Sequence, residues 1–232
     1  MNIRAAIFDK DGTLFDFQST WGVWTGLILA RIAGEDTALF EQLAQALKYD
    51  AQARKIMPGS VIVAGTPLEI AQNIQRFKSD MTVAEILNQL NEEAEHAPQV
   101  LVTDLRILTA KLRVLGLQLS VMTNDAERPA RAHLAAAGAL QLFDHVIGSD
   151  SGFGAKPEAV PLLALAAKMD VPPACCVMVG DSQHDLHSGR EAGMRVVAVL
   201  TGLAGREELS SLADVVLPDV SHLPAWISAQ NS

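Results

Sequence analysis

Cysteine is almost absent from this sequence of 232 residues, since only Cys175 and Cys176 occur, side by side. A disulfide between neighbouring cysteines is strained, so we expect two small buried thiols. No signal-peptide pattern precedes the first predicted strand. A chain with neither feature fits a reducing compartment, and we expect a cytoplasmic location.

Long apolar runs and excess positive charge are also missing. The longest mostly apolar stretch, Trp21 to Ala33, has 13 residues, whereas a membrane-spanning helix needs about 20. With 18 basic and 27 acidic residues the net charge is -9, which repels nucleic acid and gives anionic membranes little attraction. We therefore expect neither as a partner. Small phosphorylated molecules remain possible where local cations offset the field, and no pattern points to a particular oligomeric state.

The chain is long enough for one large domain or for a main domain with an insertion. Its 49% apolar content suits a globular α/β protein. Residues 16–97 read as successive helices, and proline after Thr66 and glutamate three residues after Thr66 and Thr82 predict capping boxes at two helix starts. The predicted helices are Trp21 to Ala33, Glu35 to Lys48, one ending at Phe77 and one ending at Glu95.

From Pro98 onward strands alternate with helices of 10 to 15 residues, which predicts right-handed crossovers and a parallel sheet. After a first strand over residues 1–8, the predicted strands are Gln118 to Met122, His145 to Gly148, Cys176 to Val179, Val196 to Leu200 and Asp214 to Leu217. The predicted helices include Val102 to Leu115, Glu127 to Ala137 and one that Pro157 begins. The sequence thus predicts a Rossmann-like α/β core, residues 1–15 and 98–232, with an inserted all-helical cap, residues 16–97.

Two acids one residue apart follow the first strand. Side chains at i and i+2 of an extended segment share a face, so Asp9 and Asp11 can reach one phosphoryl group or metal ion. Gly12 and Thr13 then allow the backbone to turn closely around that group. An ordinary strand-end turn is the alternative, because Asp and Gly are common in turns.

Three further candidates follow later strands, where ligands bind in parallel α/β sheets. The Thr123 hydroxyl and Asn124 come after one strand, at a helix start that could bind an anion or be a plain cap. Lys156 precedes the next predicted helix and could be a solvated charge. Asp181 and Asp185 follow another strand, where a capped helix start is the alternative.

Each piece alone is weak, but the ordered set resembles the haloacid dehalogenase-like hydrolase superfamily. The matching motifs are Asp9-Lys10-Asp11-Gly12-Thr13, Thr123, Lys156, and Gly180-Asp181 with Asp185. Their spacing, with a helical cap between the first two, is similar to the phosphoglycolate phosphatase branch. The resemblance covers nearly the whole chain.

The resemblance implies a phosphatase that works through an aspartyl phosphate. Asp9 is then the nucleophile, and Asp11 protonates the leaving alcohol and later activates water. Lys156 and Thr123 hold the phosphoryl oxygens, with Gly12 and Asn124 beside them.

The implied cofactor is Mg²⁺, a hard cation that prefers oxygen ligands. It would take Asp9, Asp181 and the backbone carbonyl of Asp11, with Asp185 behind them. When Asp11 is protonated, the three remaining carboxylates balance Mg²⁺ and Lys156 before a dianionic substrate arrives.

The histidines and two of the tryptophans are interpreted as structural or surface residues. His184 and His187 could bind a transition metal, but we favour surface or supporting positions. The other four histidines are scattered through the chain and carry no predicted role. Trp21 and Trp24 are expected in the cap core or at its seam with the α/β core.

Several functions compete on this pattern. A dehalogenase has no use for Asp11, and a binding protein is expected to have lost one of the motif residues. A phosphomutase keeps both acids and stays open as the alternative. For the substrate, Arg54 and Lys55 are the adjacent basic pair of the cap and could bind a carboxylate such as that of phosphoglycolate, although a solvated loop pair is the competing interpretation.

Overall fold

The fold is organised around a six-stranded parallel sheet with the strand order β5-β4-β1-β6-β7-β8. A computed structural model describes residues 2–231. The strands are β1 (Ala5–Phe8), β4 (Gln118–Met122), β5 (His145–Ile147), β6 (Cys176–Gly180), β7 (Arg195–Val199) and β8 (Val215–Leu217). The predicted α/β fold with a parallel sheet is confirmed. The first strand is shorter than predicted, and Met1 lies outside the described residues.

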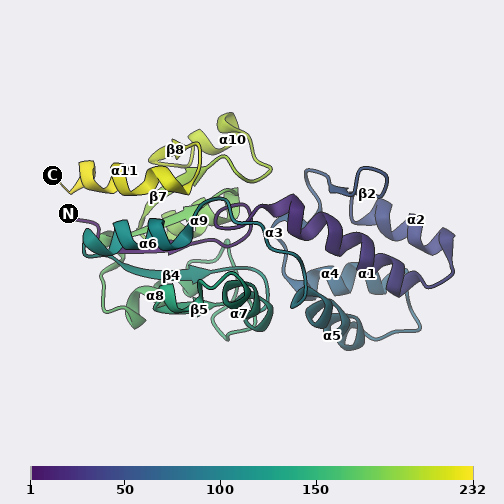
Figure 1. Cartoon of the computed structure of the whole chain (residues 1–232). Coiled ribbons are helices and arrows are strands. Elements are labelled where there is room, and N and C mark those ends of the chain that lie inside the picture. The colour runs from purple at the N-terminus through teal and green to yellow at the C-terminus, as the bar shows by residue number, and fades with distance from the viewer. Residues whose placement is uncertain (1, 232) are drawn as a thin grey trace.

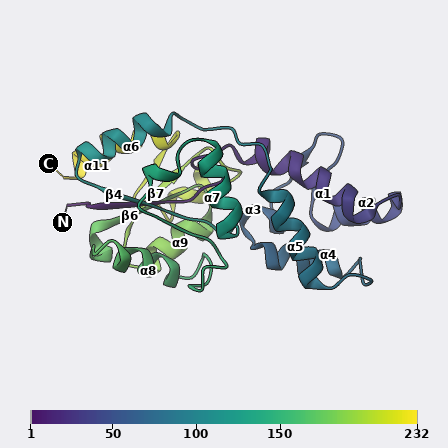
Figure 2. The same cartoon turned by 60° about the horizontal axis from the view of Figure 1, so that its bottom comes forward.

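Helices cover both faces of the sheet. They are α6 (Leu105–Val114), α7 (Glu127–Ala136), α8 (Val160–Lys168), α9 (Gln183–Glu191), α10 (Arg206–Ser210) and α11 (Leu223–Gln230). Ala6 and Phe8 of β1 belong to a core cluster with α6, α7 and α11, whereas Ala5 and Ile7 pack with α8. Figure 2 shows α6 and α11 on one side of the sheet and α8 and α9 on the other. Because both faces are covered, β1 is apolar throughout rather than alternating.

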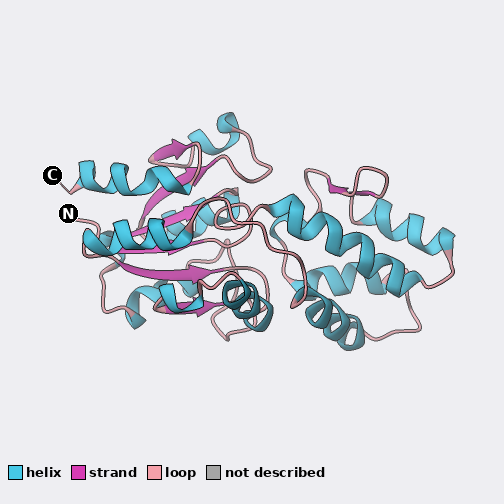
Figure 3. Ribbon diagram, viewed as in Figure 1, coloured by secondary structure: helices cyan, strands magenta, loops and turns pink. Residues whose placement is uncertain are grey.

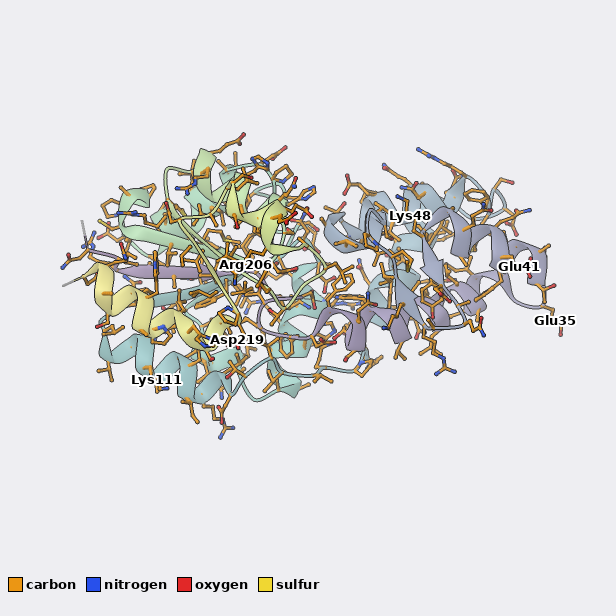
Figure 4. The ribbon with its side chains drawn as sticks, turned by 90° about the horizontal axis from the view of Figure 1, so that it is seen from above. Glu35, Glu41, Lys48, Lys111, Arg206 and Asp219 are labelled. Atoms are coloured by element: carbon orange, nitrogen blue, oxygen red, sulfur yellow. The ribbon has the colours of Figure 1, made fainter. Side chains whose placement is uncertain are left out.

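Residues 16–97, called the helical insertion below, lie beyond the carboxyl ends of the strands (Figures 1 and 3). The insertion contains α1 (Val23–Ala33), α2 (Thr37–Ala46), α3 (Val61–Ala64), α4 (Pro67–Gln75) and α5 (Val83–Ala94). A five-residue π-helical segment, Gln18–Gly22, leads into α1. The insertion has a core cluster of its own, which includes Trp21 and Trp24 as expected. In Figure 4, Glu35 and Glu41 mark its end farthest from the sheet.

The predicted capping boxes are both present. Thr66 and Glu69 bond reciprocally at the start of α4, and Thr82 and Glu85 do the same at the start of α5. Each pair satisfies backbone N–H groups that the first helical turn leaves free. These local signals were readable because donor and acceptor lie three residues apart.

The prediction of an all-helical insertion is wrong at one place. Two short antiparallel strands, β2 (Tyr49–Asp50) and β3 (Lys55–Ile56), form a hairpin. The turn contains no glycine. Instead the Asp50 carboxylate accepts from the N–H groups of Gln52 and Ala53, and Arg54 takes a left-handed φ of 53°. Two-residue strands are too short to show an alternating pattern, so no hairpin signal can be read along the chain here.

Two smaller expectations also need correction. The short helices α3 and α10 and the last helix, α11, were not predicted. The helix after Lys156 begins at Val160 rather than at Pro157, and Pro161 occupies its first turn, a position where the missing N–H costs nothing.

Candidate active site

Strand register brings the predicted motifs to one edge of the sheet. Phe8 of the central strand β1 pairs with Val121 of β4 on one side and with Val179 of β6 on the other. Asp9 therefore lies level with the last residues of both neighbouring strands, and its N–H donates to the Val179 carbonyl at 2.8 Å. One step further along those strands come Thr123 and Asp181.

Lys156 joins two of the acids. Its Nζ lies 2.5 Å from Asp9 Oδ1 and 2.6 Å from Asp185 Oδ1, and it also donates to the Met122 carbonyl at 3.1 Å. The other Asp185 oxygen accepts from the N–H and hydroxyl of Ser182. Both Asp185 oxygens are thus occupied by the protein, which makes Asp185 a positioning residue for Lys156.

Asp181 is held from three sides. The Thr13 hydroxyl donates to Asp181 Oδ1 at 3.1 Å. A Cβ atom at Gly202 would lie 1.7 Å from Asp181 Oδ2, and one at Gly12 would lie 2.4 Å from the same oxygen. The close approach of these two loops therefore requires glycine at both positions, and Gly12 also has a φ of +85°.

Burial shifts the pKa values of Asp9, Asp181 and Lys156. Burial raises the pKa of Asp9 to about 7, with Lys156 opposing the rise and Asp185 and Asp11 adding to it. Burial, reinforced by Asp9 and Asp185, also raises the pKa of Asp181. For Lys156, burial favours the neutral amine, but Asp185 and Asp9 outweigh it and the pKa rises above its ordinary value. Lys156 therefore stays positive, whereas the acids need a further cation to ionise together.

Lys10, which carried no separate role in the sequence analysis, holds Asp11 from beneath. Lys10 is fully buried, and its Nζ lies 2.7 Å from Asp11 Oδ2 and 3.6 Å from Asp125 Oδ2. The other Asp11 oxygen, Oδ1, is buried without a hydrogen-bond partner. Burial opposes the charge on Lys10, but Asp11 and Asp125 raise its pKa above the ordinary value. One Asp11 oxygen is thus held by Lys10, whereas the other has no hydrogen-bond partner among the described residues.

His133 links this lysine to the helical insertion. Its Nδ1 lies 3.0 Å from Lys10 Nζ, and its Nε2 lies 2.6 Å from the Ala94 carbonyl at the end of α5. An ammonium can only donate and a carbonyl can only accept, so His133 is the neutral tautomer with the proton on Nε2. Burial, together with the Lys10 charge, lowers the pKa of His133 to about 4. Sequence reasoning missed this pair, because the two residues are 123 positions apart.

Asn124 connects the core to the helical insertion. Its Nδ2 donates to the carbonyls of Ala64 and Lys156, at 2.7 and 2.8 Å. Its Oδ1 accepts from the Lys156 N–H at 2.9 Å. The Asn124 amide is therefore engaged with backbone groups that position Lys156.

A cavity lies between the strand ends and the helical insertion, with an empty volume of about 670 Å³ including its opening to solvent. Its floor comes from the core: Asp9, Asp11, Thr123, Asn124, Asp125, Lys156, Asp181, Ser182, His184 and Asp185. Its opposite wall comes from the insertion and is mainly apolar, with Phe17, Trp21, Trp24, Ile62, Ile70 and Leu90 among its residues. The structure thus brings seven of the predicted site residues to one cavity: Asp9, Asp11, Thr123, Asn124, Lys156, Asp181 and Asp185. Gly12 is not among the lining residues and packs against Asp181 instead.

The cap residues of the prediction are elsewhere. Arg54 and Lys55 are exposed on the β2–β3 hairpin and are not among the residues that line the cavity. Of the two neighbouring histidines, His184 lies on the cavity floor, whereas His187 is exposed. Both cysteines are free thiols, as expected, but only Cys176 is buried, whereas Cys175 is half-buried.

The acid cluster suits a hard divalent cation. Carboxylate oxygens of Asp9, Asp181 and Asp185 lie within 4.8 Å of one another, and Asp9 and Asp181 carry raised pKa values that such a charge would reverse. Oxygen ligands of this kind fit Mg²⁺. Because Lys156 and Ser182 occupy Asp185, the residues that would hold the ion are Asp9 and Asp181.

Known proteins resemble this chain along most of its length. A phosphoglycolate phosphatase from Rhodospirillum rubrum is 30% identical over 97% of this chain and 90% of its own. A solved structure, described as a predicted phosphoglycolate phosphatase from Haemophilus somnus, has a TM-score of 0.73, 20% identity, and coverage of 97% and 98%. CbbY from Rhodobacter sphaeroides, solved with phosphate, has a TM-score of 0.71, 22% identity, and coverage of 95% and 96%.

These two structures support the fold alone, whereas a family model identifies the family. Residues 3–193 match the model described as haloacid dehalogenase-like hydrolase. This range contains β1 and the two acids that follow it, the helical insertion, and the segments after β4, β5 and β6 that carry Thr123, Lys156 and Asp181. The chain therefore belongs to the haloacid dehalogenase-like hydrolase family.

Proposed function

We propose that the protein is a Mg²⁺-dependent phosphomonoester hydrolase that acts on a small phosphorylated metabolite. The observation that carries the proposal is the placement of Asp9, which directly follows the central strand, contacts Lys156 and lines the cavity. The names of the phosphatase relatives support the same reaction class.

In the first step Asp9 attacks phosphorus, and the bond from phosphorus to the alcohol oxygen breaks. Asp11 gives its proton to the departing alkoxide through the unpaired Oδ1, so that a neutral alcohol leaves. Lys156 and the Thr123 hydroxyl lie where they can bind the phosphoryl oxygens. The product on the enzyme is an aspartyl phosphate.

In the second step water attacks phosphorus and Asp11 takes the proton of that water. Inorganic phosphate leaves, and Asp9 is a free carboxylate again. Bound Mg²⁺ supplies charge neutralisation for the phosphoryl oxygens. The helical insertion acts as a cap that keeps bulk water away from the intermediate.

Measured phosphate release tests the proposal. Purified enzyme is offered a panel of phosphomonoesters, with Mg²⁺ and after chelation. We expect release from several esters only with Mg²⁺. No release from any ester under either condition would contradict it.

A phosphomutase on the same motifs is the alternative. A mutase has to hold a second phosphoryl group away from Asp9, which calls for cations on the opposite wall. That wall contributes no lysine or arginine among the described lining residues. The observation favours hydrolysis.

The predicted role of Arg54 and Lys55 in binding a substrate carboxylate stays a prediction. If it holds, Arg54→Ala or Lys55→Ala should raise KM for phosphoglycolate. The same changes should affect much less the hydrolysis of an aryl phosphate that carries no charge besides its phosphate group. Equal effects on both substrates would remove the two residues from the specificity argument.

A further inference from the structure

The two sides of the cavity differ in chemistry. The floor carries the acids and Lys156, whereas the wall presents large apolar side chains such as Trp21, Ile62 and Leu90. Because the phosphoryl group belongs on the floor, the alcohol part of the substrate has to lie against this wall.

The cations near the cavity are already paired. Lys156 bonds Asp9 and Asp185. Lys10 lies beneath the floor, fully buried against Asp11 and Asp125. His184 belongs to the floor and not to the wall. A carboxylate held against the wall would lose its hydration without gaining a cation, and an unpaired buried charge is costly.

The wall does hold two unpaired polar atoms. Trp24 Nε1 and Asn91 Oδ1 are buried and have no hydrogen-bond partner among residues 2–231, and both residues line the cavity. Trp24 is on α1 and Asn91 is on α5, two helices that pack against each other. One atom is a donor and the other an acceptor, so a neutral group able to accept and donate would satisfy both.

We propose that the substrate is the phosphate ester of an uncharged alcohol, with an apolar body against Trp21 and Leu90 and one neutral polar group, such as an amide or hydroxyl, paired with Trp24 and Asn91. The inference rests on the proposed phosphatase function. This preference distinguishes the chain from enzymes that act on carboxylate-bearing esters. Binding a carboxylate against the wall costs desolvation energy, whereas a neutral polar group can pair with the two wall atoms.

Matched aryl phosphates test the charge preference. Phenyl phosphate, 4-carbamoylphenyl phosphate and 4-carboxyphenyl phosphate share one ring and differ in one substituent. We expect kcat/KM for the carbamoyl ester to exceed that for the carboxy ester by about tenfold or more. Phosphoglycolate should also be a poorer substrate than the carbamoyl ester.

Substitutions in the wall test whether Trp24 and Asn91 recognise the neutral polar group. Asn91→Leu and Trp24→Phe should each lower the preference for the carbamoyl ester over phenyl phosphate by about fivefold or more. Asn73→Leu is the matched control, because Asn73 is on α4 outside the cavity lining and bonds its own helix at Glu69. Val63→Arg places a cation on the wall and should shift the preference toward the carboxy ester.

Failure of the inference is distinguishable from failure of the proposed function. Efficient hydrolysis of 4-carboxyphenyl phosphate or phosphoglycolate, at or above the rate for the carbamoyl ester, would overturn the inference and keep the phosphatase. If no ester turns over, calorimetric binding of the same esters to Asp9→Asn enzyme with Mg²⁺ still tests the wall. Equal or tighter binding of the carboxy ester would then overturn the inference.

Discussion

At the scale of single residues, Asp9 is the group on which the proposed chemistry depends. Its backbone is fixed in the central strand and its carboxylate contacts Lys156. A residue placed this way can be tested by a change that keeps its shape and removes its nucleophilicity.

Asp9→Asn should lower phosphate release by at least about 10³-fold, because an amide is nearly isosteric with the carboxylate but a poor nucleophile. Initial rates with saturating Mg²⁺ measure the effect, and circular dichroism checks the fold. Asp170→Asn, at an exposed position with a φ of 52° that asparagine tolerates, is the control. Near-wild-type release by folded Asp9→Asn enzyme would rule out Asp9 as nucleophile.

His133 makes stability depend on pH in a defined direction. Its pKa falls from 6.5 to about 4 in the folded protein, so between these values the unfolded chain binds the extra proton. Stability contributed by neutral His133 is complete above pH 6.5 and is lost as the pH falls toward 4. At pH 5 the loss amounts to about 2 kcal/mol.

We therefore expect the free energy of unfolding of the wild type, minus that of His133→Asn, to fall by about 2 kcal/mol between pH 7.5 and pH 5. Urea denaturation at the two pH values measures it. Taking the difference cancels the opposing contributions of buried acids such as Asp125, whose pKa burial raises to about 6. His96→Asn, at an exposed histidine, is the matched control. A pH-independent difference for His133→Asn would contradict the neutral tautomer.

At the scale of elements, the loop after β7 shapes the acid cluster without contributing a charge. Gly202 packs against Asp181 Oδ2, and Thr201 donates to the Gly12 carbonyl at 2.5 Å. The loops after β1, β6 and β7 thus meet at Asp181, and each depends on the others for its position.

Gly202→Ala should displace the Asp181 carboxylate, because the new methyl group would overlap it. We expect the Mg²⁺ concentration for half-maximal activity to rise about tenfold or more. Gly205→Ala is a matched control in the same loop, since a Cβ there meets nothing within 4 Å. Unchanged Mg²⁺ dependence in Gly202→Ala would show that Asp181 adapts freely.

Helix α5 also has a role beyond packing. Its last residue, Ala94, accepts from His133 of α7, and Arg128 of α7 pairs with Glu95 just after α5 at 2.5 Å. These contacts hold the end of the insertion beside the Lys10 network, so the wall and the floor of the cavity are joined near Asp11.

At the scale of the whole molecule, the net charge is -9, and three of the acidic residues, Asp9, Asp181 and Asp185, form one buried cluster. Between residues 2 and 231, no helix has both the length and the apolar character required to cross a membrane. The molecule divides its buried surface between a sheet core and the separate core of the insertion. The cavity lies where these two cores meet.

Chelation with EDTA should abolish phosphate release and Mg²⁺ should restore it, whereas Ca²⁺ should restore little because its longer, more flexible coordination spoils in-line attack. Mg²⁺ should also raise the Tm, since a ligand that binds only the folded state stabilises it. Asp181→Asn should lose most of this Tm shift, and NaCl at equal ionic strength serves as the control. Full activity in exhaustively chelated enzyme would contradict the metal role.

The order of the strands from Pro98 onward, the helices from α6 to α9, the two capping boxes and the motif residues after the strands could all be predicted from the sequence. These signals are local: apolar runs, turn residues and donor–acceptor pairs lie within a few positions of one another. Parallel strands then bring their carboxyl ends together, so Asp9, Thr123, Lys156 and Asp181 could be placed at one edge without coordinates.

How those groups are paired, and which residues face them, depends on how the chain packs in three dimensions. Lys10 contacts His133 across 123 positions, and Gly202 packs against Asp181 from another loop. The apolar wall and the exposed hairpin that carries Arg54 could not be predicted from the sequence either. Helical periodicity predicts which face of a helix is buried but not which element packs against that face. Such contacts depend on how separate elements pack in space, and no local sequence pattern predicts which distant residues come into contact.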